Sequence, residues 1–273
     1  MRNPALSRTF SEVMDFKQRC AVVTGGSSGI GKACALALGR AGVRVALTYH
    51  SSEAEAREVV AAIEEAGGKA IACQADVGRE EDVEALFAAA EKAFGTVSLL
   101  VNSAGVNMAD TPIAKMELAQ FDGVLRSDLT GPFLTCRRFV RGLEASQEGD
   151  GKGRIVNVSS IHERAPRPGA VDYDSAKGGL AQLTATLALE LAPQGIAVNG
   201  VAPGMILTPM NQSALDDVEE RKRKEASIPW RRAGTAEEVA DLVVFLLSDT
   251  ADYITGTTVT IDGGLSLVTA QGA

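Results

Sequence analysis

Short apolar runs, rich in β-branched residues, alternate along the chain with longer segments in which apolar residues recur every three or four positions. The short runs predict buried strands, and the longer segments predict amphipathic helices. We expect strands at Cys20–Thr24, Arg44–Thr48, Ala70–Cys73, Leu99–Asn102, Arg154–Val158, Ala197–Val201 and Thr257–Ile261. We expect helices at Ile30–Ala41, Glu53–Glu65, Glu80–Ala93, Leu118–Leu143, Tyr173–Leu191 and Ala236–Leu247. This alternation is typical of a parallel sheet with helices on both faces.

No internal repeat, low-complexity tract or long linker interrupts the pattern. We therefore predict a single doubly wound α/β domain over residues 16–273, preceded by an N-terminal extension of residues 1–15. The least regular stretch, residues 205–230, follows the sixth strand and is expected at the carboxyl edge of the sheet, where such folds bind ligands. We predict that it forms a substrate lid and that its charge run, Glu219–Glu225, is a solvated helix face.

Composition narrows the function classes. The 273 residues include 27 Lys and Arg against 35 Asp and Glu, for a formal charge of −8, which disfavours a nucleic-acid partner. No apolar run approaches the roughly 20 residues of a membrane helix, and the first residues lack an export signal, so we expect a cytoplasmic protein without a membrane partner. The four cysteines show no CxxC spacing, which predicts reduced, buried thiols and, with only two histidines, no metal site.

A glycine-rich turn follows the first strand and opens directly into a helix: Thr24-Gly25-Gly26-Ser27-Ser28-Gly29-Ile30-Gly31. Such a turn lets backbone N–H groups and the helix dipole face a pyrophosphate, while the last glycine lets the helix pack closely on the strand. Glycine clusters alone are often tight turns. The predicted strand before this turn and the predicted helix after it favour a dinucleotide site. Its residues are Gly25, Ser27, Ser28, Gly29, Ile30 and Gly31.

The end of the second strand bears on the choice of dinucleotide. An NAD site often places an acidic residue here to hold the ribose 2′-OH, but this chain has Tyr49-His50-Ser51-Ser52. Serine hydroxyls and a helix N-terminus favour a phosphate, so we predict NADP(H) over NAD(H). His50, with an ordinary pKa near 6.5, would strengthen this binding in mild acid. The alternative is that Ser52 is simply the N-cap of the next helix.

Ser160, Tyr173 and Lys177 form the candidate catalytic group. Tyr173 and Lys177 are four residues apart, so their side chains meet on one face of the predicted helix. An ammonium near a phenol favours the phenolate, which brings proton transfer within reach near neutral pH. Ser160 follows a predicted strand and can hydrogen-bond the substrate oxygen whose proton Tyr173 exchanges.

These motifs resemble those of the short-chain dehydrogenase/reductase family. The order and spacing match from about Phe16 to Leu265, through Thr24–Gly31, Asp76-Val77, Asn102-Ser103-Ala104-Gly105, Ser160, Tyr173–Lys177, Pro203-Gly204 and Asp262-Gly263-Gly264. The resemblance implies a seven-stranded Rossmann fold, an NAD(P) cofactor and hydride transfer between nicotinamide and a carbonyl or alcohol carbon. It also implies roles: Tyr173 as general acid/base, Lys177 as its activator and ribose ligand, and Ser160 as the substrate-oxygen donor. Further cofactor contacts are implied for Asp76, Val77, Asn102, Ala104, Gly105, Pro203, Gly204, Ile206 and Thr208.

Two residues depart from the family pattern. Asp128 stands where the family has an asparagine in the helix before the fifth strand, and Ser103 stands where a second asparagine is usual. The asparagine's main-chain carbonyl is retained, but the side chain loses its NH₂ donors. An ionised Asp128 near Lys177 would weaken the effect of the lysine on Tyr173, so we count Asp128 among the catalytic candidates.

Only details of the motifs bear on the identity of the substrate. The run Asn157–Glu163 together with Ile228-Pro229 is similar to bacterial sugar dehydrogenases, glucose dehydrogenase in particular, and His162 would then contact a sugar alongside Ser160 and Tyr173. The alternative for His162 is a solvated surface loop.

Three hypotheses remain open for the activity. The first is a dehydrogenase of alcohols or sugars, or the corresponding reductase. The second is a 3-oxoacyl carrier-protein reductase, whose acidic carrier would need a basic patch such as Arg137, Arg138 and Arg141. The third is a dinucleotide-binding protein whose catalysis is impaired at Asp128. The family also implies a homotetramer in which the two long helices, 118–143 and 173–191, pack between subunits.

Overall fold

The computed structural model of the chain describes residues 16, 19–106, 110–146, 152–211 and 215–270. The predicted N-terminal extension, residues 1–15, lies outside the described residues, and so do residues 212–214 of the predicted lid. Within the described ranges, no helix is both long enough and apolar enough to cross a bilayer.

Seven parallel strands form one sheet in the order β3-β2-β1-β4-β5-β6-β7. The order reverses at β1, so β1 pairs with both β2 and β4, and the connections on either side run in opposite directions. The strands are β1 (Cys20–Val23), β2 (Arg44–Tyr49), β3 (Lys69–Gln74), β4 (Val97–Asn102), β5 (Arg154–Val158), β6 (Ala197–Pro203) and β7 (Thr258–Ile261). The predicted doubly wound Rossmann fold is confirmed.

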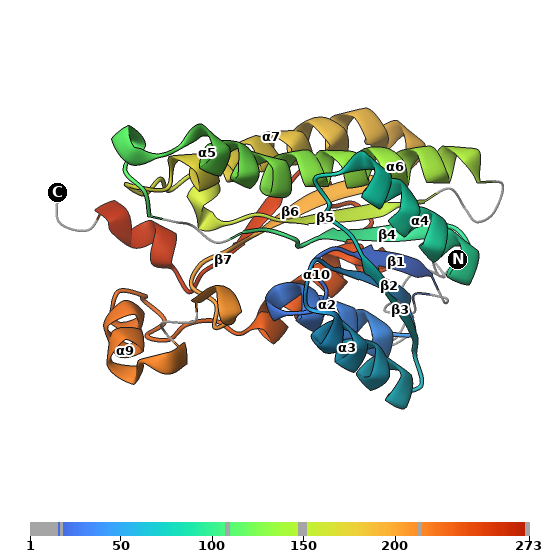
Figure 1. The fold of residues 1–273 in the computed structure, drawn as a ribbon, viewed down its shortest axis with the longest axis horizontal. Coiled ribbons are helices and arrows are strands. Elements are labelled where there is room, and N and C mark those ends of the chain that lie inside the picture. Colours follow the sequence, from blue (N-terminus) through green and yellow to red (C-terminus); the bar gives the residue numbers. More distant parts are fainter. Residues whose placement is uncertain (1–15, 17–18, 107–109, 147–151, 212–214, 271–273) are drawn as a thin grey trace, which may run out of the picture.

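Helices cover both faces of this sheet (Figure 1). One layer holds α4 (Glu80–Phe94), α5 (Leu118–Leu125), α6 (Gly131–Ala145) and α7 (Val171–Leu191). The other holds α2 (Gly29–Arg40), α3 (Glu53–Glu65) and α10 (Ala236–Leu247), while α9 (Val218–Ala226) lies apart at one end. Short helical turns are η2 (Ile113–Lys115), η3 (Arg126–Thr130), η4 (Ile161–Glu163), η5 (Ala192–Gln194), η6 (Pro209–Asn211), η7 (Asp249–Ala251) and η8 (Leu265–Ala270).

The alternation of side chains along β1 shows how the two cores are built. Ala21 and Val23 point into the cluster beneath α2 and α10, whereas Cys20 and Val22 point into the cluster beneath α4 and α6. Because successive side chains of a strand point to opposite faces, a fully apolar strand supplies both cores at once. The sheet is therefore rigid at its centre, and its carboxyl edge is free to hold a site.

The predicted long helix 118–143 is interrupted in the structure. It consists of α5 and α6 joined by the π-helical turn η3, in which the N–H of Gly131 donates to the carbonyl of Arg126, five residues earlier. Pro132 follows directly and has no N–H, so the carbonyl of Asp128 loses its usual donor four residues on. A proline at this point interrupts the α-helical ladder, and π turns are frequent at functional sites.

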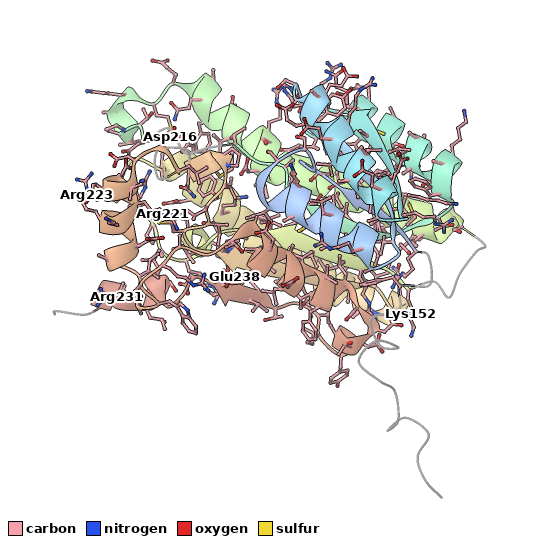
Figure 2. The ribbon with its side chains drawn as sticks, turned by 90° about the horizontal axis from the view of Figure 1, so that it is seen from below. Lys152, Asp216, Arg221, Arg223, Arg231 and Glu238 are labelled. Atoms are coloured by element: carbon pink, nitrogen blue, oxygen red, sulfur yellow. The ribbon has the colours of Figure 1, made fainter. Side chains whose placement is uncertain are left out.

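The predicted solvated helix within residues 205–230 is confirmed as α9, in which no residue is buried. Its charges pair along the helix, as in Arg221 with Glu225 at 3.0 Å and Lys222 with Glu219 at 2.9 Å. Figure 2 shows Arg221 and Arg223 at the end of the molecule opposite Lys152. The many charges of this segment therefore face solvent.

The cysteines are free thiols. Cys20, Cys34 and Cys136 are buried as expected, and burial raises the pKa of each thiol to about 12. Cys73 is only partly buried, which differs from the expectation. Thiols with pKa values this high hold their protons at neutral pH and are poor nucleophiles.

Candidate active site

A cavity of about 590 Å³ lies at the carboxyl ends of the strands, on both sides of the reversal at β1. Doubly wound sheets bind ligands at this position. The cavity walls include most residues that the sequence predicts: Gly25, Ser27, Ser28, Gly29, Ile30, Gly31, Tyr49, His50, Ser51, Ser52, Asp76, Val77, Ala104, Gly105, Asp128, Ser160, Tyr173, Lys177, Pro203, Gly204, Ile206 and Thr208. Predictions spread over the whole chain thus converge on one cavity.

The glycine turn is held against the loop after β4. The hydroxyl oxygen of Thr24 accepts hydrogen bonds from the backbone N–H groups of Ser103 and Ala104, each at 3.0 Å. A β-carbon added to Gly25 would lie 2.9 Å from the α-carbon of Ala104, and one added to Gly31 would lie 2.2 Å from the carbonyl oxygen of Gly25. Only glycine fits at these two positions, so the turn can pack its backbone directly against neighbouring backbone beside the cavity.

The start of α2 has the features of an anion site. Its first N–H groups have no partner within the helix, as in every helix, and the dipole adds partial positive charge. Ser28 is the N-cap, but its side chain makes no capping hydrogen bond. Gly29 has φ 52°, the left-handed region that favours glycine. The free hydroxyl and the free N–H groups therefore face the cavity together.

The residues at the end of β2 form a second wall of the cavity, and this wall contains no carboxylate. Ser51 is exposed and Ser52 is half-buried, and both line the cavity beside Tyr49 and His50. Ser52 occupies the N-cap position of α3, but its side chain makes no capping hydrogen bond. The alternative that Ser52 is the N-cap of this helix is thus confirmed for its position, although its side chain does not act as a cap. Its hydroxyl is available to a ligand.

Tyr173 and Lys177 project from the first turns of α7 into the cavity, and Ser160 follows β5. All three are at least nine-tenths buried. The Nζ atom of Lys177 lies 5.3 Å from the centre of the Tyr173 ring. Ser160 Oγ accepts a hydrogen bond of 3.2 Å from the N–H of His162, so its own proton can be donated elsewhere.

Lys177 forms a buried ion pair with Asp128. Nζ lies 3.1 Å from Asp128 Oδ2 and 3.3 Å from the carbonyl oxygen of Val158, and the Asp128 side chain is fully buried. Burial disfavours the charged lysine, but the carboxylate of Asp128 and the nearby Tyr173 outweigh this effect, so the pKa of Lys177 is raised. The expected closeness of Asp128 to Lys177 is thus confirmed.

The other oxygen of Asp128 fixes the loop after β4. Oδ1 accepts a hydrogen bond of 3.0 Å from the N–H of Val106. A β-carbon on Gly105 would lie 2.9 Å from Oδ2, so this glycine leaves room for the carboxylate. Asp128 therefore links the cavity wall at Val106 to Lys177 across the site.

Two predicted residues lie outside the cavity walls. The Asn102 side chain is buried and bonds to Asn157 at 2.8 Å and Thr135 at 2.7 Å, beneath the cavity floor. The Nδ1 atom of His162 lies 2.8 Å from the carbonyl oxygen of Ala165, and the His162 ring packs edge-on against the Tyr173 ring with centroids 6.1 Å apart. A position next to a motif does not fix the direction of a side chain, and both side chains bond to protein partners here. Their contacts with a ligand stay predictions.

The cavity also contains residues that the sequence does not single out. Arg126 and Ser127 come from η3, Val106 from the loop after β4, and Met210 and Asn211 from η6. The irregular stretch after β6 is the signal for the last two. The first two face the cavity because η3 departs from α-helical geometry, which periodicity alone does not predict.

Two of the three arginines suggested as a basic patch for a carrier protein, Arg137 and Arg138, are paired within the protein, whereas Arg141 is exposed. Arg137 pairs with Glu80 at 2.5 Å, and Arg138 pairs with Glu84 and Glu91, each at 2.7 Å. These partners lie on the adjacent α4. The two arginines therefore cross-link α6 to α4 rather than present free positive charge.

A Rossmann fold with a glycine turn and a Ser, Tyr and Lys group in one cavity defines an oxidoreductase that uses a nicotinamide dinucleotide. A family model described as enoyl-(acyl carrier protein) reductase matches residues 25–266. The chain belongs to the short-chain dehydrogenase/reductase family, and it acts on CH–OH or C=O groups.

Named relatives agree on the class. The chain is 44% identical to 3beta-hydroxysteroid dehydrogenase 1 of Eggerthella lenta, covering 93% of this chain and 95% of that protein. It is 38% identical to glucose 1-dehydrogenase 2 of Bacillus subtilis, covering 94% and 98%. A crystal structure of a dehydrogenase/reductase from Sinorhizobium meliloti superposes with a TM-score of 0.86 at 37% identity, covering 93% and 98%.

Proposed function

We propose that the protein is an NADP(H)-preferring dehydrogenase that oxidises a secondary hydroxyl on a saturated ring, with an aldose as the leading substrate class, through Ser160, Tyr173 and Lys177. One observation carries the mechanism: the three side chains line the same cavity beside the glycine turn. The names of the relatives support the substrate class, because position 1 of glucose and the 3β position of a steroid are both hydroxyl-bearing ring carbons.

The cavity fits a dinucleotide. The start of α2 would hold the pyrophosphate, because its first N–H groups lack helical partners and Ser28 makes no capping hydrogen bond. The close backbone packing at Gly25 and Gly31 fixes the turn beside it. Ala104 and Gly105 would lie behind the cofactor, and Pro203, Gly204, Ile206 and Thr208 would run along the nicotinamide. When bound, the nicotinamide accepts or supplies the hydride.

Ser160 orients the substrate oxygen. Its Oγ already accepts the N–H of His162, so the hydroxyl proton is directed to another acceptor, and the hydroxyl oxygen of the substrate is the acceptor that the reaction requires. Tyr173 then removes the proton from that oxygen during oxidation and returns it during reduction. The burial of both side chains excludes competing water from these hydrogen bonds.

Lys177 favours the phenolate of Tyr173. Its raised pKa keeps the ammonium charged in the cavity, and a positive charge near the ring lowers the free energy of the ionised phenol. Asp128 opposes part of this effect, because its carboxylate lies 3.1 Å from the same ammonium. In this enzyme the carboxylate of Asp128 therefore partly neutralises the charge of Lys177, whereas the family has a neutral asparagine at position 128.

The NADP(H) preference rests on the end of β2. Ser51 and Ser52 line the cavity, their neighbours Tyr49 and His50 carry no negative charge, and the start of α3 favours an anion. A 2′-phosphate would meet hydroxyl donors there, whereas an acidic residue would repel it.

Three wider inferences accompany this proposal. The chain forms one domain, residues 16–273, in which residues 205–230, including η6 and α9, act as the substrate lid. The enzyme is a cytoplasmic homotetramer, consistent with its free thiols. Exposed Phe133 on α6 and Leu189 on α7 support packing of these helices between subunits, because large apolar side chains in helix faces favour burial.

The test is a fluorescence titration with NADPH and NADH, followed by a turnover screen of aldoses, hydroxysteroids, simple ketones and a 3-oxoacyl thioester. We expect tighter NADPH binding, turnover of a ring alcohol, and loss of turnover with retained binding in Tyr173→Phe. Turnover of only the thioester would mean that the substrate class is 3-oxoacyl thioesters and not ring alcohols. Tight binding without turnover of any compound would point to the impaired-catalysis hypothesis.

A further inference from the structure

Arg126 is a charged cavity residue to which the motifs assign no role. It is the first residue of η3, it is exposed, and it lines the cavity together with Asp76 and Val77. None of the ion pairs between described residues includes Arg126, whereas Arg137 and Arg138 of α6 and Arg221 of α9 are paired. Its guanidinium is therefore available to a ligand.

The stem of Arg126 is fixed over Gly78, just after β3. A β-carbon added to Gly78 would lie 2.4 Å from Cγ and 2.9 Å from Cδ of Arg126, and 3.2 Å from Oδ1 of Asp76. The arginine thus crosses from the helical layer to the end of β3 and lies on bare backbone there. Asp76 is held beside it, since Oδ1 accepts the N–H of Gly78 at 2.9 Å.

This position lies beyond the glycine turn on the β2 and β3 side of the sheet. Neighbouring strands are about 5 Å apart, so the end of β3 lies about 10 Å from the end of β1, where the pyrophosphate would bind. The adenosine of a dinucleotide extends in this direction. Ser51 and Ser52, which follow the intervening β2, line the cavity where the ribose would lie, which leaves the end of β3 for the base.

The chemistry of Arg126 fits the flat face of a base. A guanidinium is planar, weakly hydrated and prone to stack on π systems, whereas a lysine ammonium is a hydrated point charge. The neighbouring carboxylate of Asp76 can accept from an amino group at the edge of the base, and it would repel a phosphate.

We propose that Arg126 covers the face of the adenine ring of the bound dinucleotide, with its stem resting on Gly78 and Asp76 at the edge of the base. The proposal rests on the dinucleotide site described above, and it adds a residue that determines affinity for the adenosine half. The π turn η3 thus supplies the cavity with two charges, Arg126 for the adenine and Asp128 for the catalytic lysine.

The test compares Arg126→Ala and Arg126→Lys with Arg40→Ala, a matched exposed arginine at the far end of α2. NADPH and NADH are titrated by fluorescence, and AMP and 2′,5′-ADP are measured by competition. We expect both Arg126 variants to weaken all four ligands by a similar factor, roughly three- to thirty-fold. Arg40→Ala should leave all four unchanged.

A second variant checks the geometry independently. Gly78 does not have a positive φ, so Gly78→Ala tolerates the backbone but forces the stem of Arg126 aside. We expect Gly78→Ala to weaken AMP when Arg126 is present and to have little further effect in the Arg126→Ala background. Thermal unfolding of each variant confirms that the fold is kept.

Two results would overturn the proposal. A loss confined to NADPH and 2′,5′-ADP, with rescue by Arg126→Lys, would place the 2′-phosphate at Arg126 instead of the base. Unchanged affinities in both Arg126 variants would show that the arginine does not touch the ligand. Failure of the wild-type protein to bind any dinucleotide would instead contradict the proposed function, and the two failures are thereby distinguished.

Discussion

The ammonium of Lys177 lies 3.1 Å from the carboxylate of Asp128, and neither side chain is more than 6% exposed. Burial lowers the pKa of a lysine, but here the carboxylate outweighs burial and the pKa of Lys177 is raised. The lysine therefore stays charged well into the alkaline range, while Asp128 cancels part of its field at Tyr173. With a neutral residue at position 128, no carboxylate would oppose the effect of the Lys177 charge on Tyr173.

The first prediction concerns Asp128→Asn. We expect turnover to be kept or raised, because the ammonium then acts on Tyr173 without an opposing charge. We also expect the rate to change at a lower alkaline pH than in the wild type, because the carboxylate that raises the pKa of Lys177 is removed. The free energy of unfolding should fall by about 3–5 kcal/mol, because a buried ammonium loses its counter-charge. Steady-state kinetics from pH 5 to 10 and urea unfolding measure the two effects.

The matched control for Asp128→Asn is Asp122→Asn, an exposed position on α5. It should change neither the pH profile nor the stability. A large loss of turnover in Asp128→Asn, with dinucleotide binding retained, would mean that the carboxylate has a catalytic role of its own.

The second prediction concerns the 2′-phosphate. The double substitution of Ser51 and Ser52 by alanine should weaken NADPH about tenfold and leave NADH nearly unchanged, because two hydrogen bonds to a charged group are lost. Ser51→Asp should go further and reverse the preference by repulsion. Parallel titrations with both dinucleotides measure this, and NADH serves as the internal control. Equal losses for the two dinucleotides would contradict the assignment of the serines to the 2′-phosphate.

The fold could be predicted closely because most strands are short apolar runs that supply both cores, as in β1. Periodicity placed α2, α3, α4 and α10 for the same reason: each has one apolar face against the sheet. The break between α5 and α6 was missed, because apolar spacing continues through η3 and Pro132 is also tolerated at the start of a helix.

Site residues could be predicted where backbone geometry requires a residue type. They were harder to predict where a side chain can point in several directions. The glycine turn and the pair of Tyr173 and Lys177 follow from spacing, because strand ends and helix turns place them. His162 turns to the carbonyl of Ala165, and Asn102 turns into the buried network with Asn157. Contacts across the cavity, such as Arg126 over Gly78, depend on the relative placement of layers, which no local pattern encodes.

The third prediction tests the glycine turn. In Gly31→Ala the new methyl group would lie 2.2 Å from the carbonyl oxygen of Gly25, so α2 must move away from the turn. We expect affinity for both NADPH and NADH to fall at least tenfold, with a lower melting temperature, because the N–H groups that would face the pyrophosphate are displaced.

Gly178→Ala is the control for Gly31→Ala. Gly178 lies within α7, and an added methyl group there meets only a backbone oxygen at 3.9 Å. Alanine in a helix interior should keep binding and stabilise the protein by up to about 1 kcal/mol. Equal binding by wild type and Gly31→Ala would show that the turn does not form the dinucleotide site.

The last prediction concerns acid stability at the start of α10. Oε1 of Glu238 pairs with Arg232 at 2.5 Å, and Oε2 accepts the N–H of Thr235 at 2.9 Å, closing the capping box (Figure 2 labels Glu238). The hydrogen bond from Arg232 and then that from Thr235 lower the pKa of Glu238 to about 2 from an ordinary value of 4.5. A lowered folded-state pKa stabilises the fold above the unfolded-state value, and this stabilisation is lost as the pH falls from 4.5 through about 2.

Glu238→Gln cannot titrate, so the gap in free energy of unfolding between it and the wild type should depend on pH. The side chain is 41% exposed and solvent screens its ion pair, so we expect a gap of only about 1 kcal/mol at pH 7. The gap should narrow steadily in urea unfolding at pH 5, 4 and 3, because the wild-type carboxylate gains a proton and loses its advantage over glutamine. Glu237→Gln, one residue earlier in the same turn, should show a smaller gap, since that side chain is not part of the capping box. If the gap between wild type and Glu238→Gln stays constant with pH, the charge of Glu238 does not stabilise the start of α10. The geometry of its hydrogen bonds alone would then do so.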